Sequence, residues 1–124
     1  MATLFVMVGF HMRLGAALVV VTAVGTAWAL VGALRGDVSP VLRAFARLCA
    51  LALLAQVLLG LLLLATGHRP NDGLHYVYGG VVLLCIPAGI AYAGSSDVRR
   101  EAWGLCFGLF AAVLLAARAV TTGG

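Results

Sequence analysis

Hydrophobic residues are gathered into four long stretches, at about residues 4–34, 41–66, 74–92 and 102–120. Short turns rich in glycine, proline, serine and aspartate separate these stretches. A membrane-spanning helix needs about 20 apolar residues, so each stretch is long enough to cross a bilayer. None shows the alternation of apolar and polar residues that is typical of a strand. The pattern therefore predicts four transmembrane helices.

The turns determine how these helices are arranged. They lie at residues 35–40, 67–73 and 94–97, and loops this short force each helix to run antiparallel to the one before it. Glycine at a helix end and serine or aspartate as the next N-cap are the expected stop and start signals. We expect one all-α transmembrane domain over residues 1–124, an up-down four-helix bundle.

Composition strengthens the membrane assignment. Hydrophobic residues make up 64% of the chain and charged residues 10%, and the mean hydropathy is +1.13. Soluble domains carry only about 45–50% apolar and about 25% charged residues, so the apolar excess must face lipid. This composition argues against a disordered tail, a nucleic-acid-binding protein and a secreted disulfide scaffold. The first predicted partner is a lipid bilayer, and no nucleic acid is expected.

The basic residues, all of them arginine, predict an orientation. Five lie on the side of the first and third turns, and three lie on the other side. The two groups are Arg35, Arg43, Arg47, Arg99 and Arg100, and Arg13, Arg69 and Arg118. The positive-inside rule places the larger group in the cytoplasm and both termini outside. The absence of lysine is explained by a GC-rich genome, which indicates the cell membrane of a prokaryote.

The third stretch repeats the first at an offset of 64 residues. The matched pairs are His11 and His75, Gly15 and Gly79, Gly25 and Gly89, and Trp28 and Tyr92. A weaker echo sets Leu48-Cys49 against Leu105-Cys106. The repeated His-x-x-x-Gly is informative because the chain has only three histidines. We interpret it as a tandem repeat of a two-helix hairpin, with a pseudo-twofold axis along the membrane normal.

The first and third helices are separated by two crossings, so they run in the same direction and lie diagonally in an up-down bundle. We therefore expect His11 and His75 at similar depth, facing each other across the core. Two neutral imidazoles that face each other in a bundle core can ligate a metal or a haem iron from both sides. Gly15 and Gly79 follow one turn later on the same helix face and leave room for a flat macrocycle. The alternative is that these small residues serve helix packing and the histidines lie among the lipid headgroups.

Two cations and a third histidine lie on the same side. Arg13 and Arg69 are candidate partners of haem propionates, or else interface anchors. His68 could add a third imidazole, but its turn is polar and we expect it to be solvated. The sequence has neither the Cys, His and Met cluster of a copper site nor four ligands for a structural zinc.

Three segments resemble one half of the haem A synthase family. They are Phe10–Ala17 (FHMRLGAA), Gln56–Gly60 (QVLLG) and Leu74-His75. The family has two similar four-helix halves, one holding a b-type haem and the other oxidising a methyl group of haem O, and half-length members are known. The resemblance implies that His11 and His75 match its axial ligands, and that Gln56 and Gly60 match its helix-packing motif.

The departures from the family bear on the activity. The catalytic half has a Glu one turn before its first histidine, where this chain has Met7 and Val8. The outer-loop cysteine pair is absent, and Glu101, the only Glu, falls on the cytoplasmic side. The sequence is therefore more similar to the half that holds the cofactor.

Three functions remain open. The first is a membrane protein that binds haem b through His11 and His75, with the site near the outer face, and that relays electrons or holds haem. It would act as a homodimer or within a larger respiratory complex. The second is a half-size enzyme similar to haem A synthase. The third is a haem-free accessory subunit of a membrane complex, in which the two histidines would not face each other.

Overall fold

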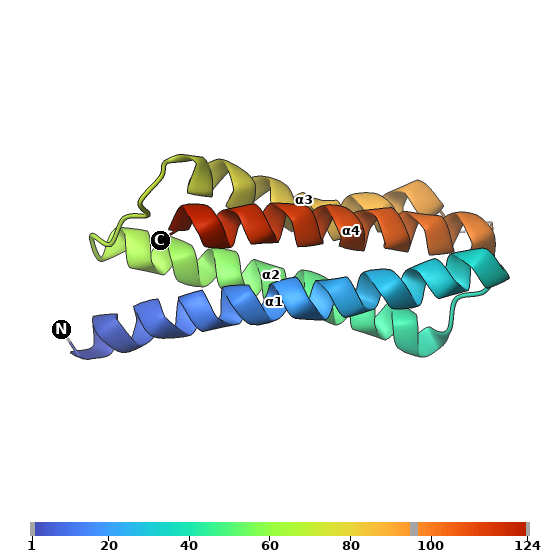
Figure 1. The fold of residues 1–124 in the computed structure, drawn as a ribbon, viewed down its shortest axis with the longest axis horizontal. Coiled ribbons are helices and arrows are strands. Elements are labelled where there is room, and N and C mark those ends of the chain that lie inside the picture. Colours follow the sequence, from blue (N-terminus) through green and yellow to red (C-terminus); the bar gives the residue numbers. More distant parts are fainter. Residues whose placement is uncertain (1, 95–96, 124) are drawn as a thin grey trace.

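The computed structural model describes residues 2–94 and 97–123, so Met1, Ser95, Ser96 and Gly124 lie outside the described residues. It has four helices: α1 (Ala2–Arg35), α2 (Pro40–Ala65), α3 (Leu74–Ala93) and α4 (Val98–Gly123). They run alternately up and down, so both termini lie at one end of the bundle together with the α2–α3 loop (Figure 1). All four are long and apolar enough to cross a membrane, which confirms the predicted multi-pass bundle.

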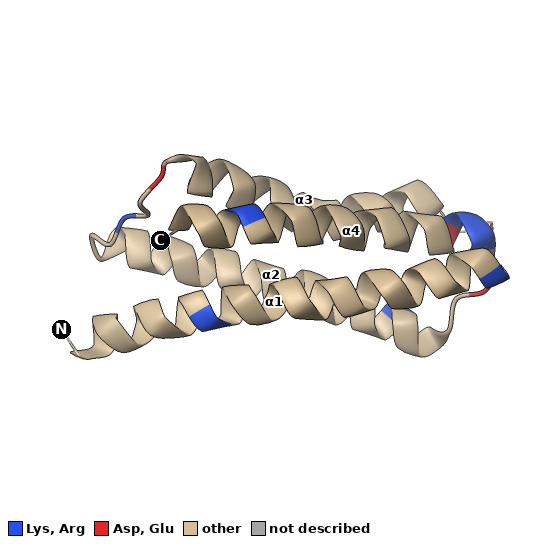
Figure 2. Cartoon of the chain, viewed as in Figure 1, with Lys and Arg blue, Asp and Glu red and all other residues tan. Residues whose placement is uncertain are grey.

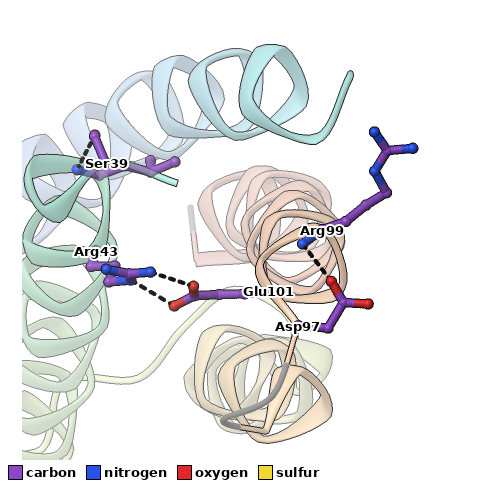
Figure 3. A network of polar contacts seen from close by, with 6 residues as sticks. Ser39, Arg43, Asp97, Arg99 and Glu101 are labelled. Atoms are coloured by element: carbon purple, nitrogen blue, oxygen red, sulfur yellow. Dashed lines mark hydrogen bonds and ion pairs between the residues drawn. The ribbon is translucent and has the colours of Figure 1, made fainter. Parts of the chain in front are cut away.

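The helix boundaries follow from local capping. The Oγ of Ser39 accepts a hydrogen bond from the backbone N–H of Leu42 at 3.1 Å, and Pro40 is the first residue of α2. Helix α4 begins at Val98, earlier than the predicted 102, because Asp97 caps it (Figure 3). The Asp97 Oδ1 accepts from the N–H of Arg99 at 2.9 Å. Gly36, with a φ of 75°, supplies the left-handed conformation after α1.

The helices pack in the cyclic order α1, α2, α3, α4, so α1 and α3 are diagonal. The closest packing joins α3 to α4, where glycines let the two backbones touch. A Cβ added at Gly89 would collide with the backbone of Gly104, and one at Gly108 would lie 2.8 Å from the Cys85 carbonyl oxygen. Helix α2 packs less closely against its neighbours.

The pattern of burial supports the predicted repeat. Helices α1 and α3 bury equivalent positions 64 residues apart: Leu18 and Val82, Thr22 and Ile86, Gly25 and Gly89, Ala29 and Ala93. Helices α2 and α4 do the same at 63 residues: Leu42 and Leu105, Ala46 and Leu109, Cys49 and Ala112, Leu53 and Ala116. The predicted echo of Leu48-Cys49 in Leu105-Cys106 is wrong, because Leu48 is 64% exposed whereas Leu105 is 3% exposed.

Charged residues lie toward the two ends of the bundle (Figure 2). We call the end away from the termini the arginine-rich end, since it holds Arg35, Arg43, Arg47, Arg99 and Arg100. There Arg43 of α2 makes a bidentate ion pair with Glu101 of α4 (Figure 3). Arg43 Nε donates to Glu101 Oε2 and Nη2 donates to Oε1, each at 2.8 Å. This contact joins the two diagonal helices that do not carry the candidate ligands.

Candidate functional site: a histidine pair in a cavity

His11 of α1 and His75 of α3 meet across the bundle, near the end that holds both termini. Their ring centroids are 6.1 Å apart and the ring planes are inclined at 76°. Both side chains are half-buried. The diagonal arrangement of α1 and α3 is what brings these two residues, 64 positions apart in sequence, to the same place.

His75 is held by the last turn of α4. Its Nδ1 lies 2.8 Å from the carbonyl oxygen of Ala119. Because a carbonyl only accepts hydrogen bonds, this contact selects the tautomer with the proton on Nδ1. The lone pair of the neutral ring then lies on Nε2, which is the atom available for a metal.

A glycine of α4 also shapes the position of this ring. A Cβ added at Gly123 would lie 2.9 Å from the His75 Cε1 and 3.0 Å from its Nδ1. The ring therefore packs directly against the Gly123 backbone. Sequence reasoning missed both Ala119 and Gly123, because one acts through its backbone carbonyl and the other through the absence of a side chain.

His11 has an equivalent position against α2. A Cβ at Gly60 would lie 3.1 Å from the His11 Cε1. The side-chain Nε2 of Gln56 donates a hydrogen bond of 2.7 Å to the backbone carbonyl of His11. Gln56 thus joins α2 to α1, as expected for a polar residue in the middle of a membrane span.

Two buried polar atoms lie beside this contact. The Nδ1 of His11 and the Oε1 of Gln56 are buried, and neither has a hydrogen-bond partner among the described residues. Buried polar side-chain atoms are hydrogen-bonded in the large majority of cases. The Nδ1 of His75 therefore has a hydrogen-bond partner, whereas the Nδ1 of His11 has none among the described residues.

The histidines line a cavity of about 560 Å³, and residues of all four helices and of the α2–α3 loop contribute to its lining. This volume falls within the range of about 300–1,000 Å³ that is typical of ligand sites. Both predicted glycines line it. A Cβ at Gly79 would meet no described atom within 4 Å, so the space beside Gly79 is open.

Gly15 has a different role from the one predicted. A Cβ there would lie 3.0 Å from the Gln56 Nε2 and 3.5 Å from the Val120 Cγ2. Gly15 therefore makes room for the Gln56 side chain, whereas the expectation was that it makes room for a ligand. Of the two predicted glycines, only Gly79 has open space beside it.

The α2–α3 loop contributes the polar part of the lining, with His68, Arg69 and Asn71. Arg13 is exposed and is not among the described residues that line the cavity, so the structure brings only one of the two predicted arginines to the site. His68 does not complete a three-ligand centre: within residues 2–94 and 97–123, no group of three or more His, Cys, Asp or Glu side chains is placed to hold a metal ion.

These contacts limit the chemistry of the site. The protein offers two imidazoles from opposite sides, and no third His, Cys, Asp or Glu of the described residues is placed to join them, so a transition metal bound here would take other ligands from a separate molecule. Comparisons of the chain with protein-family models, with curated proteins and with solved structures find no match. The geometry of the cavity and of its two histidines is therefore the evidence that bears on function.

Proposed function

We propose that this protein binds one b-type haem between His11 and His75 and acts as an electron relay or a haem-holding subunit in a membrane. The observation that carries the proposal is the distance of 6.1 Å between the two ring centroids. An imidazole nitrogen binds a transition metal at about 2 Å and lies about 1 Å from its ring centre, so two imidazoles on opposite sides of one ion have centroids about 6 Å apart.

The inclination of the rings agrees with this use. Rotation of an imidazole about its metal–nitrogen bond leaves the coordination intact, so planes at 76° are compatible with two axial ligands on one metal. The Nδ1 contact of His75 with Ala119 leaves Nε2 of that ring free. A hydrogen bond from the non-ligating nitrogen is the usual support of a metal-binding histidine.

The rest of the cavity suits a flat, mostly apolar group with acidic substituents. Open space lies beside Gly79, and the buried side chains of Leu18, Leu53 and Val82 contribute to the lining. Arg69 lies in the loop that lines the cavity and is the residue that would pair with a propionate. When bound, haem supplies reversible one-electron redox chemistry, and ligation on both sides favours electron transfer over reactions at an open iron position.

The two other functions receive less support. For an enzyme similar to haem A synthase, the required Glu would lie one turn before His11, whereas Glu101 is paired with Arg43 at the arginine-rich end. For a haem-free accessory subunit, the two histidines would have no reason to face each other across a cavity. We therefore extend the resemblance to haem A synthase only to the half that holds a cofactor.

The setting of the site is part of the proposal. The larger group of arginines lies at the end away from the histidines, so the positive-inside rule would place the haem and both termini toward the outer face of a prokaryotic plasma membrane. We expect a homodimer or a larger respiratory complex, because a haem held this way needs an electron donor and an acceptor.

The experiment is an absorption spectrum of the purified protein after addition of haem b and reduction. The proposal predicts one haem per chain with a low-spin b-type spectrum, and loss of that spectrum in His11→Ala and in His75→Ala. His68→Ala is the matched control and should keep it. A wild-type protein that is folded and takes up no haem would contradict the proposal.

A further inference from the structure

The two histidines occupy similar positions, but they differ in the partner of Nδ1 and in the ring edge that faces the neighbouring glycine. A Cβ at Gly123 would lie nearer to the Nδ1 of His75, whereas one at Gly60 would lie nearer to the Nε2 of His11. His75 contacts Gly123, and its Nδ1 meets the carbonyl oxygen of Ala119, four residues earlier in α4. His11 contacts Gly60, and the residue four positions earlier in α2 is Gln56. Gln56 and Ala119 are 63 residues apart, the same offset that relates the buried positions of α2 and α4. At this position α4 supplies an oxygen acceptor from its backbone, the Ala119 carbonyl, whereas α2 carries the carboxamide side chain of Gln56.

We propose that Gln56 is a positioning residue for His11, and that its Oε1 accepts a hydrogen bond from the Nδ1–H of His11 when haem is bound. This contact would fix the tautomer that leaves Nε2 of His11 to the iron. The inference rests on the proposed haem-binding function and adds to it the residue that orients the His11 ring toward the iron.

Two buried polar atoms support this proposal. His11 Nδ1 and Gln56 Oε1 are both buried without partners among the described residues, and they belong to two residues that already share a hydrogen bond of 2.7 Å. A neutral imidazole has one donor and one acceptor, and a carboxamide oxygen accepts. A hydrogen bond between these atoms satisfies both of them and requires no other side chain.

The surroundings of Gln56 allow this role. Gly15 has no side chain, and a Cβ there would lie 3.0 Å from the Gln56 Nε2, so the carboxamide occupies the space that a larger residue would fill. Its Nε2 is committed to the His11 carbonyl, which identifies the remaining atom as the oxygen. The carboxamide is thereby held next to the residue that it is proposed to orient.

The test compares Gln56→Leu with the control Leu58→Ala, which changes an α2 side chain that is 55% exposed. We expect Gln56→Leu to weaken haem b binding by about 10- to 100-fold, as is typical when the hydrogen-bond partner of a metal-binding histidine is removed. We also expect its reduction potential to rise, because a histidine without an acceptor at Nδ1 is a weaker donor to ferric iron. Leu58→Ala should match the wild type in both measurements.

Gln56→Glu keeps the test decisive if Gln56→Leu does not fold. It retains an oxygen acceptor, so it should bind haem and have a reduction potential at or below that of the wild type. A Gln56→Leu protein with wild-type affinity and potential would overturn this inference and leave the haem site standing, and so would a Gln56→Glu potential above the wild type. A folded wild-type protein that takes up no haem would overturn both proposals.

Discussion

Gly60 and Gly123 are equivalent residues of α2 and α4, 63 positions apart, and each lies directly against the ring of a histidine. A Cβ would lie 3.1 Å from the His11 Cε1 in the first case and 2.9 Å from the His75 Cε1 in the second. Both distances are tighter than ordinary van der Waals contact. The depth of each ring in the bundle is therefore set by the absence of a side chain on the neighbouring helix.

The first prediction concerns these two glycines. Gly123→Ala should weaken haem binding by about tenfold or more, because the hydrogen bond to Ala119 prevents the His75 ring from moving aside. Gly60→Ala should have a smaller effect, since its Cβ would lie 3.1 Å from the His11 Cε1, whereas a Cβ at Gly123 would lie within 3.0 Å of two His75 ring atoms. A haem b titration measures both. Gly9→Ala is the control, because a Cβ there meets no described atom within 4 Å, and equal affinities for all three variants would contradict the prediction.

A second prediction concerns the α3–α4 contact. Gly89→Val should destabilise the protein by about 3 kcal/mol, since the added side chain collides with the backbone of Gly104, which cannot rotate away. Unfolding in detergent, followed by circular dichroism, measures the change. Gly80→Ala on the same helix should not destabilise the protein, because its Cβ would meet no described atom within 4 Å and alanine favours a helix over glycine. A fully stable Gly89→Val protein would mean that α3 and α4 pack differently.

A third prediction concerns the ion pair of Arg43 with Glu101, which we expect to contribute to stability and not to haem binding. Glu101→Gln should lower the melting temperature by at most a few degrees, since the paired side chains are 38% and 25% exposed and water screens them. The effect should shrink as salt is added. The haem spectrum should not change, because Arg43 and Glu101 lie at the arginine-rich end of the bundle. Loss of haem in Glu101→Gln would show that the two ends are coupled.

A fourth prediction assigns the propionate partner. Arg69→Gln should lower the affinity for haem b by about tenfold, the usual size of a lost charge-assisted hydrogen bond, because Arg69 lines the cavity. The same substitution should leave the affinity for haem dimethyl ester unchanged. Arg13→Gln is the control and should bind both forms like the wild type. A loss in Arg13→Gln equal to that in Arg69→Gln would assign the propionates to both arginines.

Much of the fold could be predicted from the sequence, because lipid leaves few options for the backbone. Apolar stretches of sufficient length and short turns fixed the number, order and direction of the helices. The up-down order of the helices was enough to place His11 and His75 on diagonal helices, and the repeated His-x-x-x-Gly drew attention to these two residues. Those features depend on side-chain type and spacing along one helix, which can be read from a single sequence.

The details of the site could not be predicted, because they depend on contacts between helices. The Ala119 carbonyl is a backbone group, so the residue type carries no sign of its role. The correspondence between α2 and α4 becomes visible only in which residues are buried, and Leu48-Cys49 offered a false match to Leu105-Cys106. The ion pair of Arg43 with Glu101 joins residues 58 positions apart on diagonal helices, and no local pattern indicates it.

The most direct test of the central claim is electron paramagnetic resonance of the oxidised, haem-loaded protein. Two imidazoles on one ferric iron give a low-spin signal, and planes inclined as steeply as the 76° between His11 and His75 make that signal strongly anisotropic. We expect such a signal in the wild type, and its replacement by a high-spin signal, or loss of haem, in His11→Ala and His75→Ala. A high-spin wild-type protein, or a low-spin signal that survives either substitution, would contradict it.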